Sequence, residues 1–173
     1  TGNAKLIIHS QVGLERFSDV AQIIKKDDRI QFMHKTVTAP GLYHLGDVYV
    51  YPSRLEGVGL TIAEALACGC RVVVNRLPGL EDWLWPELVS SGWVRLVEMP
   101  TLVETDQPAP SDLPDYVGRL RRALLEQGEN SDAPPLCLAE FLRENSWSGV
   151  YRKIVKQYPR PASDVRVVEG RSA

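Results

Sequence analysis

Long apolar runs are missing from this chain of 173 residues. A transmembrane helix needs roughly 20 consecutive apolar residues. No stretch approaches that length, and the start of the sequence does not resemble a signal peptide. These absences exclude a membrane-spanning helix within the sequence. We expect a cytoplasmic location, with any peripheral attachment to a membrane made through regions outside this sequence.

Cysteine and histidine are scarce, with three residues of each. Cys68 and Cys70 are two positions apart, which is not a zinc-binding spacing, and no second pair of Cys or His accompanies them. We interpret these cysteines as small side chains that pack at a helix end, in a reducing compartment. His34 is open to two interpretations, an ordinary loop residue and a residue that faces a ligand.

An excess of charge of either sign is also absent. The formal net charge is −2 and the isoelectric point is about 5.9. Domains that bind nucleic acid or anionic membranes normally carry a basic surface, so we expect neither as a main partner. Hydrophobic residues make up 44% of the chain and charged residues 24%, which is ordinary for a globular protein. The length suits one domain.

What the chain does contain is an alternation of short apolar runs with amphipathic segments. Leu14–Lys26 has apolar residues at helical spacing, and Val72–Val74 is too apolar for a strand with a solvent-facing side. The strands that we predict are Lys5–Ile8, which we expect to be buried, Ile30–Met33, Gly46–Tyr51, Val72–Val74 and Trp93–Val97. Strands that alternate with helices indicate an α/β fold, with a Rossmann-like parallel sheet flanked by helices.

The remaining helices follow from the same spacing. We predict a helix from Leu60 to Cys68 that ends at Gly69 in the left-handed conformation. We predict a second short helix from Gly79 to Leu88, interrupted at a proline. The later helices that we predict are Asp112–Gln127, Leu136–Glu144 and Trp147–Gln157. The cluster of Trp83, Trp85 and Trp93 fits either core packing or a platform for a sugar.

The segment from Glu56 to Glu64 is the strongest functional signal. Its two carboxylates are eight residues apart, with Gly57 and Gly59 in the loop and a predicted helix start near Leu60. Glycine lets a ligand approach the backbone closely, and the unpaired N–H groups of a first helical turn favour a phosphate. Carboxylates accept hydrogen bonds from sugar hydroxyls. The arrangement suits a sugar joined to a nucleoside by a diphosphate, although each glutamate alone also fits a residue that only stabilises or solvates the helix.

At these residues the chain resembles the C-terminal, donor-binding domain of retaining GT-B glycosyltransferases of family 4. The matching sequences are Glu-Gly-Val-Gly-Leu at 56–60 and Glu-Ala-Leu-Ala-Cys-Gly at 64–69, between an Asp-Val-Tyr-Val-Tyr-Pro-Ser strand end at 47–53 and Val-Val-Val at 72–74. Segments 29–33, 39–44, 78–81 and 145–158 resemble the family more loosely. Arg71 departs from the pattern, because the family usually has proline there.

The resemblance implies roles at matching positions. Glu56 would contact hydroxyls of the transferred sugar and serve catalysis, and Glu64 would bind the ribose of a nucleoside diphosphate. The other donor-binding positions are Gly57, Val58, Gly59 and Leu60 through their backbone, and His34 and Thr36 beside the base. Arg54 is a further candidate because it lies next to the loop in the sequence, where it fits either a contact to the donor phosphate or a domain interface. No metal ligand and no cofactor is implied, because the acid-rich metal motif of the other major glycosyltransferase fold is absent.

The resemblance also implies a domain organisation. Residues 1–158 would form the nucleotide-sugar binding domain, the C-terminal half of a GT-B fold, and residues 159–173 a tail. On this resemblance, we expect the sequence to lack the usual first strand of the domain, the Arg and Lys that hold the diphosphate, and the N-terminal acceptor domain. Each charge-assisted contact is worth about 1.5–3 kcal/mol, so we expect the isolated chain to have no measurable transferase activity.

The full-length parent is thus expected to transfer a sugar, with retention, from a nucleoside diphosphate sugar to a hydroxyl of a glycan or lipid-linked acceptor. Two alternatives stay open. A nucleoside diphosphate sugar epimerase of GT-B layout would turn over without an acceptor, and a non-catalytic domain would only bind nucleotide or a partner protein. The presence of both glutamates and both glycines favours the transferase.

Overall fold

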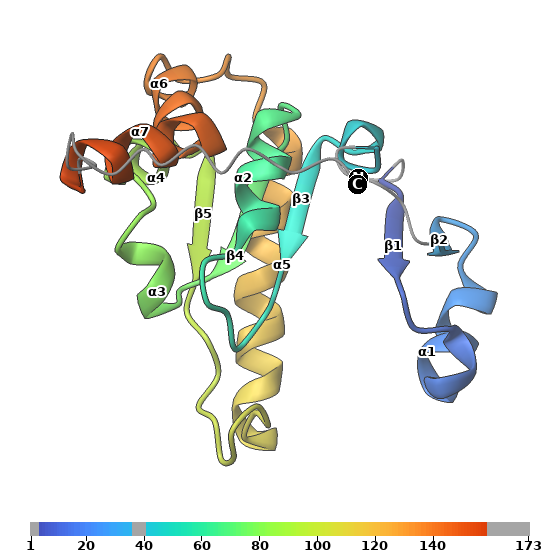
Figure 1. Ribbon diagram of the computed structural model, residues 1–173. Coiled ribbons are helices and arrows are strands. Elements are labelled where there is room, and N and C mark those ends of the chain that lie inside the picture. Colours follow the sequence, from blue (N-terminus) through green and yellow to red (C-terminus); the bar gives the residue numbers. More distant parts are fainter. Residues whose placement is uncertain (1–3, 36–40, 159–173) are drawn as a thin grey trace, which may run out of the picture.

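The computed structural model describes residues 4–35 and 41–158, and the strands of these residues form two parallel sheets. In the first sheet β1 (Leu6–Ser10) pairs with β2 (Ile30–His34). In the second sheet β3 (Val48–Tyr51), β4 (Arg71–Asn75) and β5 (Val94–Val97) follow one another in order. Figure 1 shows helices beside both sheets. The predicted α/β, Rossmann-like layout is therefore confirmed.

Helices join the successive strands. Helix α1 (Ser18–Lys26), preceded by the 3-10 turn η1 (Leu14–Arg16), leads from β1 to β2, and α2 (Leu60–Ala67) leads from β3 to β4. As predicted, Gly69 follows α2 with a φ of 86°. The other helical elements are η2 (Tyr43–Leu45), α3 (Pro78–Glu81), α4 (Pro86–Ser90), η3 (Pro110–Asp112), α5 (Leu113–Glu129), α6 (Cys137–Asn145) and α7 (Trp147–Gln157).

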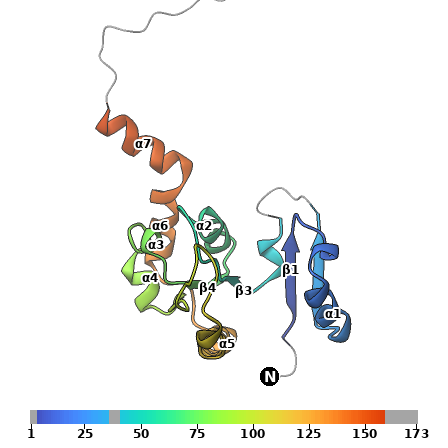
Figure 2. The same cartoon turned by 90° about the horizontal axis from the view of Figure 1, so that it is seen from below.

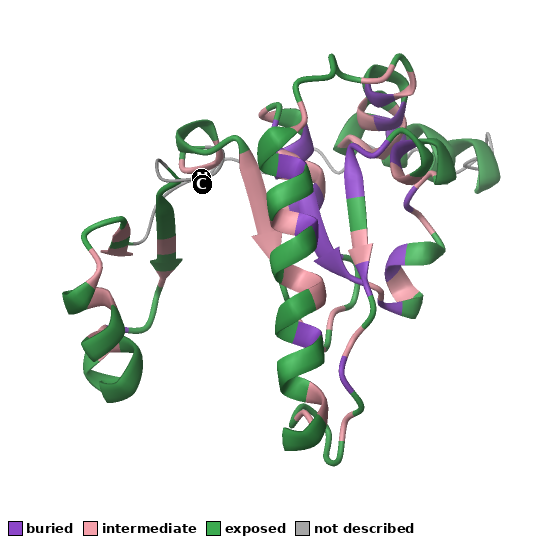
Figure 3. Cartoon of the chain, turned by 180° about the vertical axis from the view of Figure 1, so that it is seen from behind, coloured by how far each residue is buried: buried purple, intermediate pink, exposed green. Residues whose placement is uncertain are grey.

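The buried core surrounds β4. Val72 and Val74 belong to a cluster with side chains of α2 and α6, whereas Val73 belongs to a second cluster with α5. The two clusters are separate because successive side chains of a strand point to opposite faces. Figures 1 and 3 show α2 and α5 on opposite faces of this sheet, with the buried residues gathered around β4 and α2. The sheet is therefore covered on both sides, as the apolar run predicts.

Two predictions about the first sheet and its helix are wrong. Leu6 and Ile7 of β1 are exposed, although the sequence predicts a buried strand at Lys5–Ile8. Among the described residues β1 pairs only with β2, so this small sheet lacks the cover that β4 has. The predicted helix over Leu14–Lys26 is also interrupted, at Phe17, whose φ of −133° is not helical.

The three tryptophans of the predicted cluster serve packing. Trp93 is buried, and the rings of Trp83 and Trp85 lie 5.5 and 5.7 Å from the ring of Phe141 in α6, centroid to centroid. This geometry decides between the two interpretations of the cluster in favour of the core. Cys70 is buried as well, and Cys68 and Cys137 are half-buried, all three as free thiols.

The C-terminal helix α7 has the predicted bounds and extends away from the second sheet in Figure 2. Ser146 caps it, because its Oγ accepts a hydrogen bond from the backbone N–H of Gly149 at 3.0 Å. Within residues 4–35 and 41–158, no helix has both the length and the apolar character that crossing a membrane requires.

Candidate functional site

The loop between β3 and α2 brings Arg54, Glu56 and the glycine segment 57–59 to the C-terminal edge of the second sheet. Gly59 precedes α2 with a φ of 65°, a left-handed conformation that glycine adopts without strain. The carbonyl of Gly59 accepts from the N–H of Ile62 at 2.9 Å, which starts the helix. Ligands of open parallel sheets bind beyond this edge, so the loop lies where a ligand is expected.

A second loop, after β4, supports the first. A Cβ added to Gly79 would lie 2.9 Å from the carbonyl oxygen of Gly57, so the start of α3 touches the glycine loop directly. Only a residue without a side chain fits at this contact. A Cβ on Gly59 would similarly lie 3.0 Å from methyl carbons of Ile62 and Leu80. Both glycines thus set the close packing that shapes the loop.

Each glutamate of the motif is half-buried and accepts a hydrogen bond from a tyrosine. The hydroxyl of Tyr43, in η2, donates to Oε2 of Glu64 at 3.0 Å. The hydroxyl of Tyr51, at the end of β3, donates to Oε2 of Glu56, whose Oε1 accepts from the N–H of Gly57 at 3.3 Å. The structure therefore holds both predicted carboxylates in defined positions.

The two donating tyrosines are linked by a third. Tyr49 meets Tyr43 edge-on, with ring centroids 5.3 Å apart, and stacks on Tyr51 at 5.8 Å with an interplanar angle of 16°. Burial raises the pKa of all three phenols above the usual value. For Tyr43 and Tyr51 the hydrogen bond to the glutamate is the next largest cause of the higher pKa. Both hydroxyls therefore stay protonated, as donors, well beyond neutral pH.

Asn75, at the end of β4, fixes the start of the loop and was not among the predicted site residues. It is fully buried, donates to the carbonyl of Ser53 at 2.9 Å, and accepts from the hydroxyl of Tyr116 in α5 at 2.9 Å. Its position directly after the apolar run Val72–Val74 is the signal that the sequence offers for it. This bridge connects the loop to the helix on the far face of the sheet.

The N-terminus of α2 is open to a ligand. No side chain in the described part of the chain caps it, and Val58 and Leu60 are exposed. Arg54 is half-buried next to the loop, and its side chain makes no hydrogen bond or ion pair with another described residue. Arg76, by contrast, is paired with Glu81 and Glu98. Among residues 4–35 and 41–158, Arg54 is therefore a cation beside the loop that remains available.

The residues predicted beside the base lie elsewhere or outside the described chain. His34 is exposed at the end of β2, in the first sheet, and its Nε2 lies 3.2 Å from the carbonyl oxygen of Gln11. No hydrogen bond between described residues joins it to either glutamate. Thr36 falls in residues 36–40, and the tail 159–173 likewise lies outside the described residues. The base-binding role of His34 and Thr36 stays a prediction.

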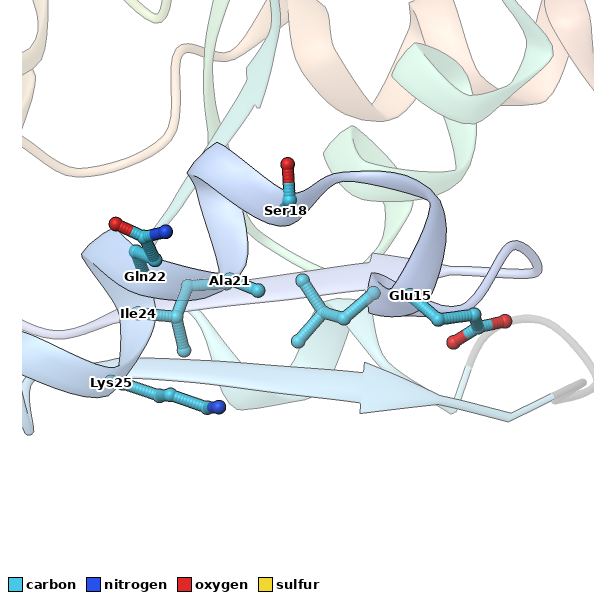
Figure 4. A pocket seen from close by; sticks show the side chains of 7 residues that line it. Glu15, Ser18, Ala21, Gln22, Ile24 and Lys25 are labelled. Carbon is cyan, nitrogen blue, oxygen red and sulfur yellow. The ribbon is translucent and has the colours of Figure 1, made fainter.

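A hollow formed by η1 and α1 is not part of this arrangement. Figure 4 shows its lining side chains, which come from η1 and α1 and include none of the predicted site residues. Across the part of the chain that the structure describes, no three Asp, Glu, His or Cys side chains gather as metal ligands would. The expectation that the site works without a metal stays a prediction.

Comparison with known proteins identifies the family. The family model described as "Glycosyl transferases group 1" matches residues 2–109, which span the two sheets, the glycine loop and both glutamates. No curated protein matches the chain significantly. A family model that covers most of the chain, on a fold of the matching type, assigns a glycosyltransferase-type function. The chain belongs to the glycosyl transferases group 1 family.

Proposed function

We propose that this chain is the donor-binding domain of a retaining glycosyltransferase. The parent enzyme transfers a sugar from a nucleoside diphosphate sugar to a hydroxyl of a glycan or lipid-linked acceptor. The observation that carries the proposal is the pair of tyrosine-held glutamates on either side of an uncapped helix start, at the C-terminal edge of a parallel sheet.

Each part of the donor has a matching group in this arrangement. Glu64, within α2, accepts hydrogen bonds from the ribose hydroxyls, and Glu56, in the loop, accepts them from the transferred sugar. The N–H groups of the first turn of α2, after Gly59, face the diphosphate, because they have no intrahelical partner and the helix dipole favours an anion there. A carboxylate next to a phosphate would repel it, so the glutamates suit the hydroxyl-bearing ends of the donor.

The chemistry of the transfer follows from this placement. As the bond between sugar and diphosphate breaks, negative charge grows on the leaving diphosphate, and fixed N–H dipoles stabilise that charge. Arg54 adds a positive charge next to the loop. We propose that no metal and no cofactor takes part, since dipoles and cations supply the same electrostatic stabilisation.

The first experiment is a titration of the isotopically labelled chain by NMR with UDP, GDP, ADP and their common sugar conjugates. The proposal expects one nucleotide to shift the resonances of residues 56–64. Glu64→Gln should weaken that binding at least fivefold, because it removes the anionic acceptor for the ribose. Gln22→Glu, which changes an exposed residue of α1, is the control and should leave it unchanged. Binding that shifts other regions, or that ignores Glu64→Gln, would contradict the proposed site.

A further inference from the structure

Both glutamates of the motif are held by hydroxyl groups that the motif itself does not contain. We infer that Tyr43 and Tyr51 are positioning residues of the donor site, each fixing one carboxylate before the ligand arrives. This inference rests on the proposed function for the identity of the ligand. The hydrogen bonds themselves are features of the ligand-free chain.

Tyr43 fixes one oxygen of Glu64 and leaves the other available. Oε2 of Glu64 accepts from the tyrosine at 3.0 Å, whereas Oε1 has no hydrogen-bond partner among residues 4–35 and 41–158. A carboxylate has two oxygens with about four acceptor positions, so one oxygen can be anchored while the other binds a hydroxyl. The anchored glutamate thus presents Oε1 to the ribose.

Tyr51 does the same for the glutamate of the loop. Oε2 of Glu56 accepts from this tyrosine, and Oε1 accepts a longer bond of 3.3 Å from the N–H of Gly57. Gly57 is exposed, so a sugar hydroxyl can approach the carboxylate from the solvent side. A glutamate in a loop has several rotamers, and the tyrosine selects one of them.

Tyr49 links Tyr43 and Tyr51, and these three tyrosines together form a frame beside the two glutamates. Its ring contacts both neighbours, edge-on with Tyr43 and stacked with Tyr51, while its hydroxyl bonds to neither glutamate. Ordering a long side chain costs conformational entropy, and that cost weakens binding when the ordering happens only as the ligand binds. A frame that orders both carboxylates in the free chain removes that cost from the binding step.

The inference is tested first without any ligand. With 13C-labelled glutamate side chains, Tyr43→Phe should move the carboxylate resonance of Glu64 and leave that of Glu56 in place, and Tyr51→Phe should do the reverse. Phenylalanine keeps the ring and hence the packing. Tyr49→Phe is the matched control and should move neither resonance. The reciprocal variant Glu64→Gln should move the ring Cζ resonance of Tyr43.

The second arm measures affinity for the nucleoside diphosphate that binds and for its sugar conjugate. Tyr43→Phe should weaken both at least fivefold, because the ribose is common to them. Tyr51→Phe should weaken only the sugar conjugate fivefold and change the nucleotide less than twofold. This difference separates positioning from general loss of structure, which would weaken both ligands in every variant.

The carboxylate resonances and the ligand affinities test the positioning inference and the proposed donor separately. Unchanged carboxylate resonances in both Tyr43→Phe and Tyr51→Phe would overturn the positioning inference, whatever binds. Shifted resonances in a chain that binds none of the nucleotides would support the positioning of the glutamates and count against the proposed donor. Shifted resonances with equal affinity in all three variants would show that the hydrogen bonds do not serve binding, which also overturns the inference.

Discussion

A tyrosine hydroxyl donates a hydrogen bond only while it keeps its proton. In this chain burial raises the pKa of Tyr43, Tyr49 and Tyr51 above the usual value of 10.0. The carboxylate that accepts from Tyr43 or Tyr51 raises it further, because ionising the phenol would place a second negative charge beside the first. The protonation of these three tyrosines therefore links the stability of the site to alkaline pH.

We predict that the free energy of unfolding decreases as the pH rises above about 10. In the unfolded chain these phenols ionise near their usual pKa, whereas the folded chain retains their protons, so the unfolded state binds fewer protons and stability falls with pH. The stabilisation is complete below pH 10. Urea unfolding between pH 8 and 11 measures it.

Tyr43→Phe should reduce this alkaline loss, because one of the shifted groups is removed. The control is Tyr151→Phe, which changes an exposed tyrosine of α7. An equal pH dependence in the wild type and in Tyr43→Phe would contradict the link between the frame and stability.

At the level of single residues, the sequence predicts the glutamates and glycines of the site but not the tyrosines that bond to the glutamates. The hydrogen bond from Tyr43 to Glu64 spans 21 residues and depends on how η2 and α2 pack, which no local spacing encodes. The alternation of Tyr49 and Tyr51 in one strand does place both on one face. That pattern was the available signal. Asn75 was missed because a polar residue at a strand end is common.

The element that most determines the site is the glycine turn before α2. Gly59 has a left-handed φ of 65°, and any Cβ there would meet Ile62 and Leu80 at 3.0 Å. Gly59→Ala should therefore destabilise the fold by about 1–2 kcal/mol from the left-handed backbone alone. It should also weaken nucleotide binding, because the loop must shift.

Gly118→Ala is the matched control for this substitution. Gly118 is exposed within α5, and a Cβ there would meet nothing within 4 Å. Alanine is the better helix former, so this change should stabilise the chain by about 0.5–1 kcal/mol. Chemical denaturation measures both variants. A Gly59→Ala protein as stable as the wild type would show that the turn can be rebuilt without glycine.

The elements were largely predictable because their signals are local. The helix from Leu60, its end at Gly69 and the bounds of Trp147–Gln157 follow from capping residues and apolar spacing. The break at Phe17 and the exposure of β1 were not predictable in this way. They depend on what covers the first sheet, and spacing along the chain says only which residues are apolar, not which neighbour they meet.

Helix α6 closes one of the two core clusters of the second sheet, the cluster that also contains α2. Phe141 is fully buried in it and lies against the rings of Trp83 and Trp85. Phe141→Ala should lower the free energy of unfolding by about 3–5 kcal/mol, since the lost burial adds to the cavity that remains. Leu136→Ala, five residues earlier at a position that is 99% exposed, should change it by less than about 0.5 kcal/mol.

Urea unfolding followed by circular dichroism compares these two variants. Equal midpoints would contradict the assignment of α6 to the core of the second sheet. The sequence predicted the layout of this core in outline, because an apolar strand such as Val72–Val74 must be covered on both faces. Which helix covers which face came only from the structure.

The separation of the two sheets determines what tryptophan fluorescence can report about the unfolding of this protein. All four tryptophans of the chain, at positions 83, 85, 93 and 147, belong to the second sheet and the helices that follow it. Tryptophan fluorescence therefore reports on the second sheet and its helices. It does not report on β1, α1 and β2, which contain no tryptophan. The first sheet could open or close without changing the signal, and a single smooth fluorescence transition would not mean that the whole chain melts as one unit.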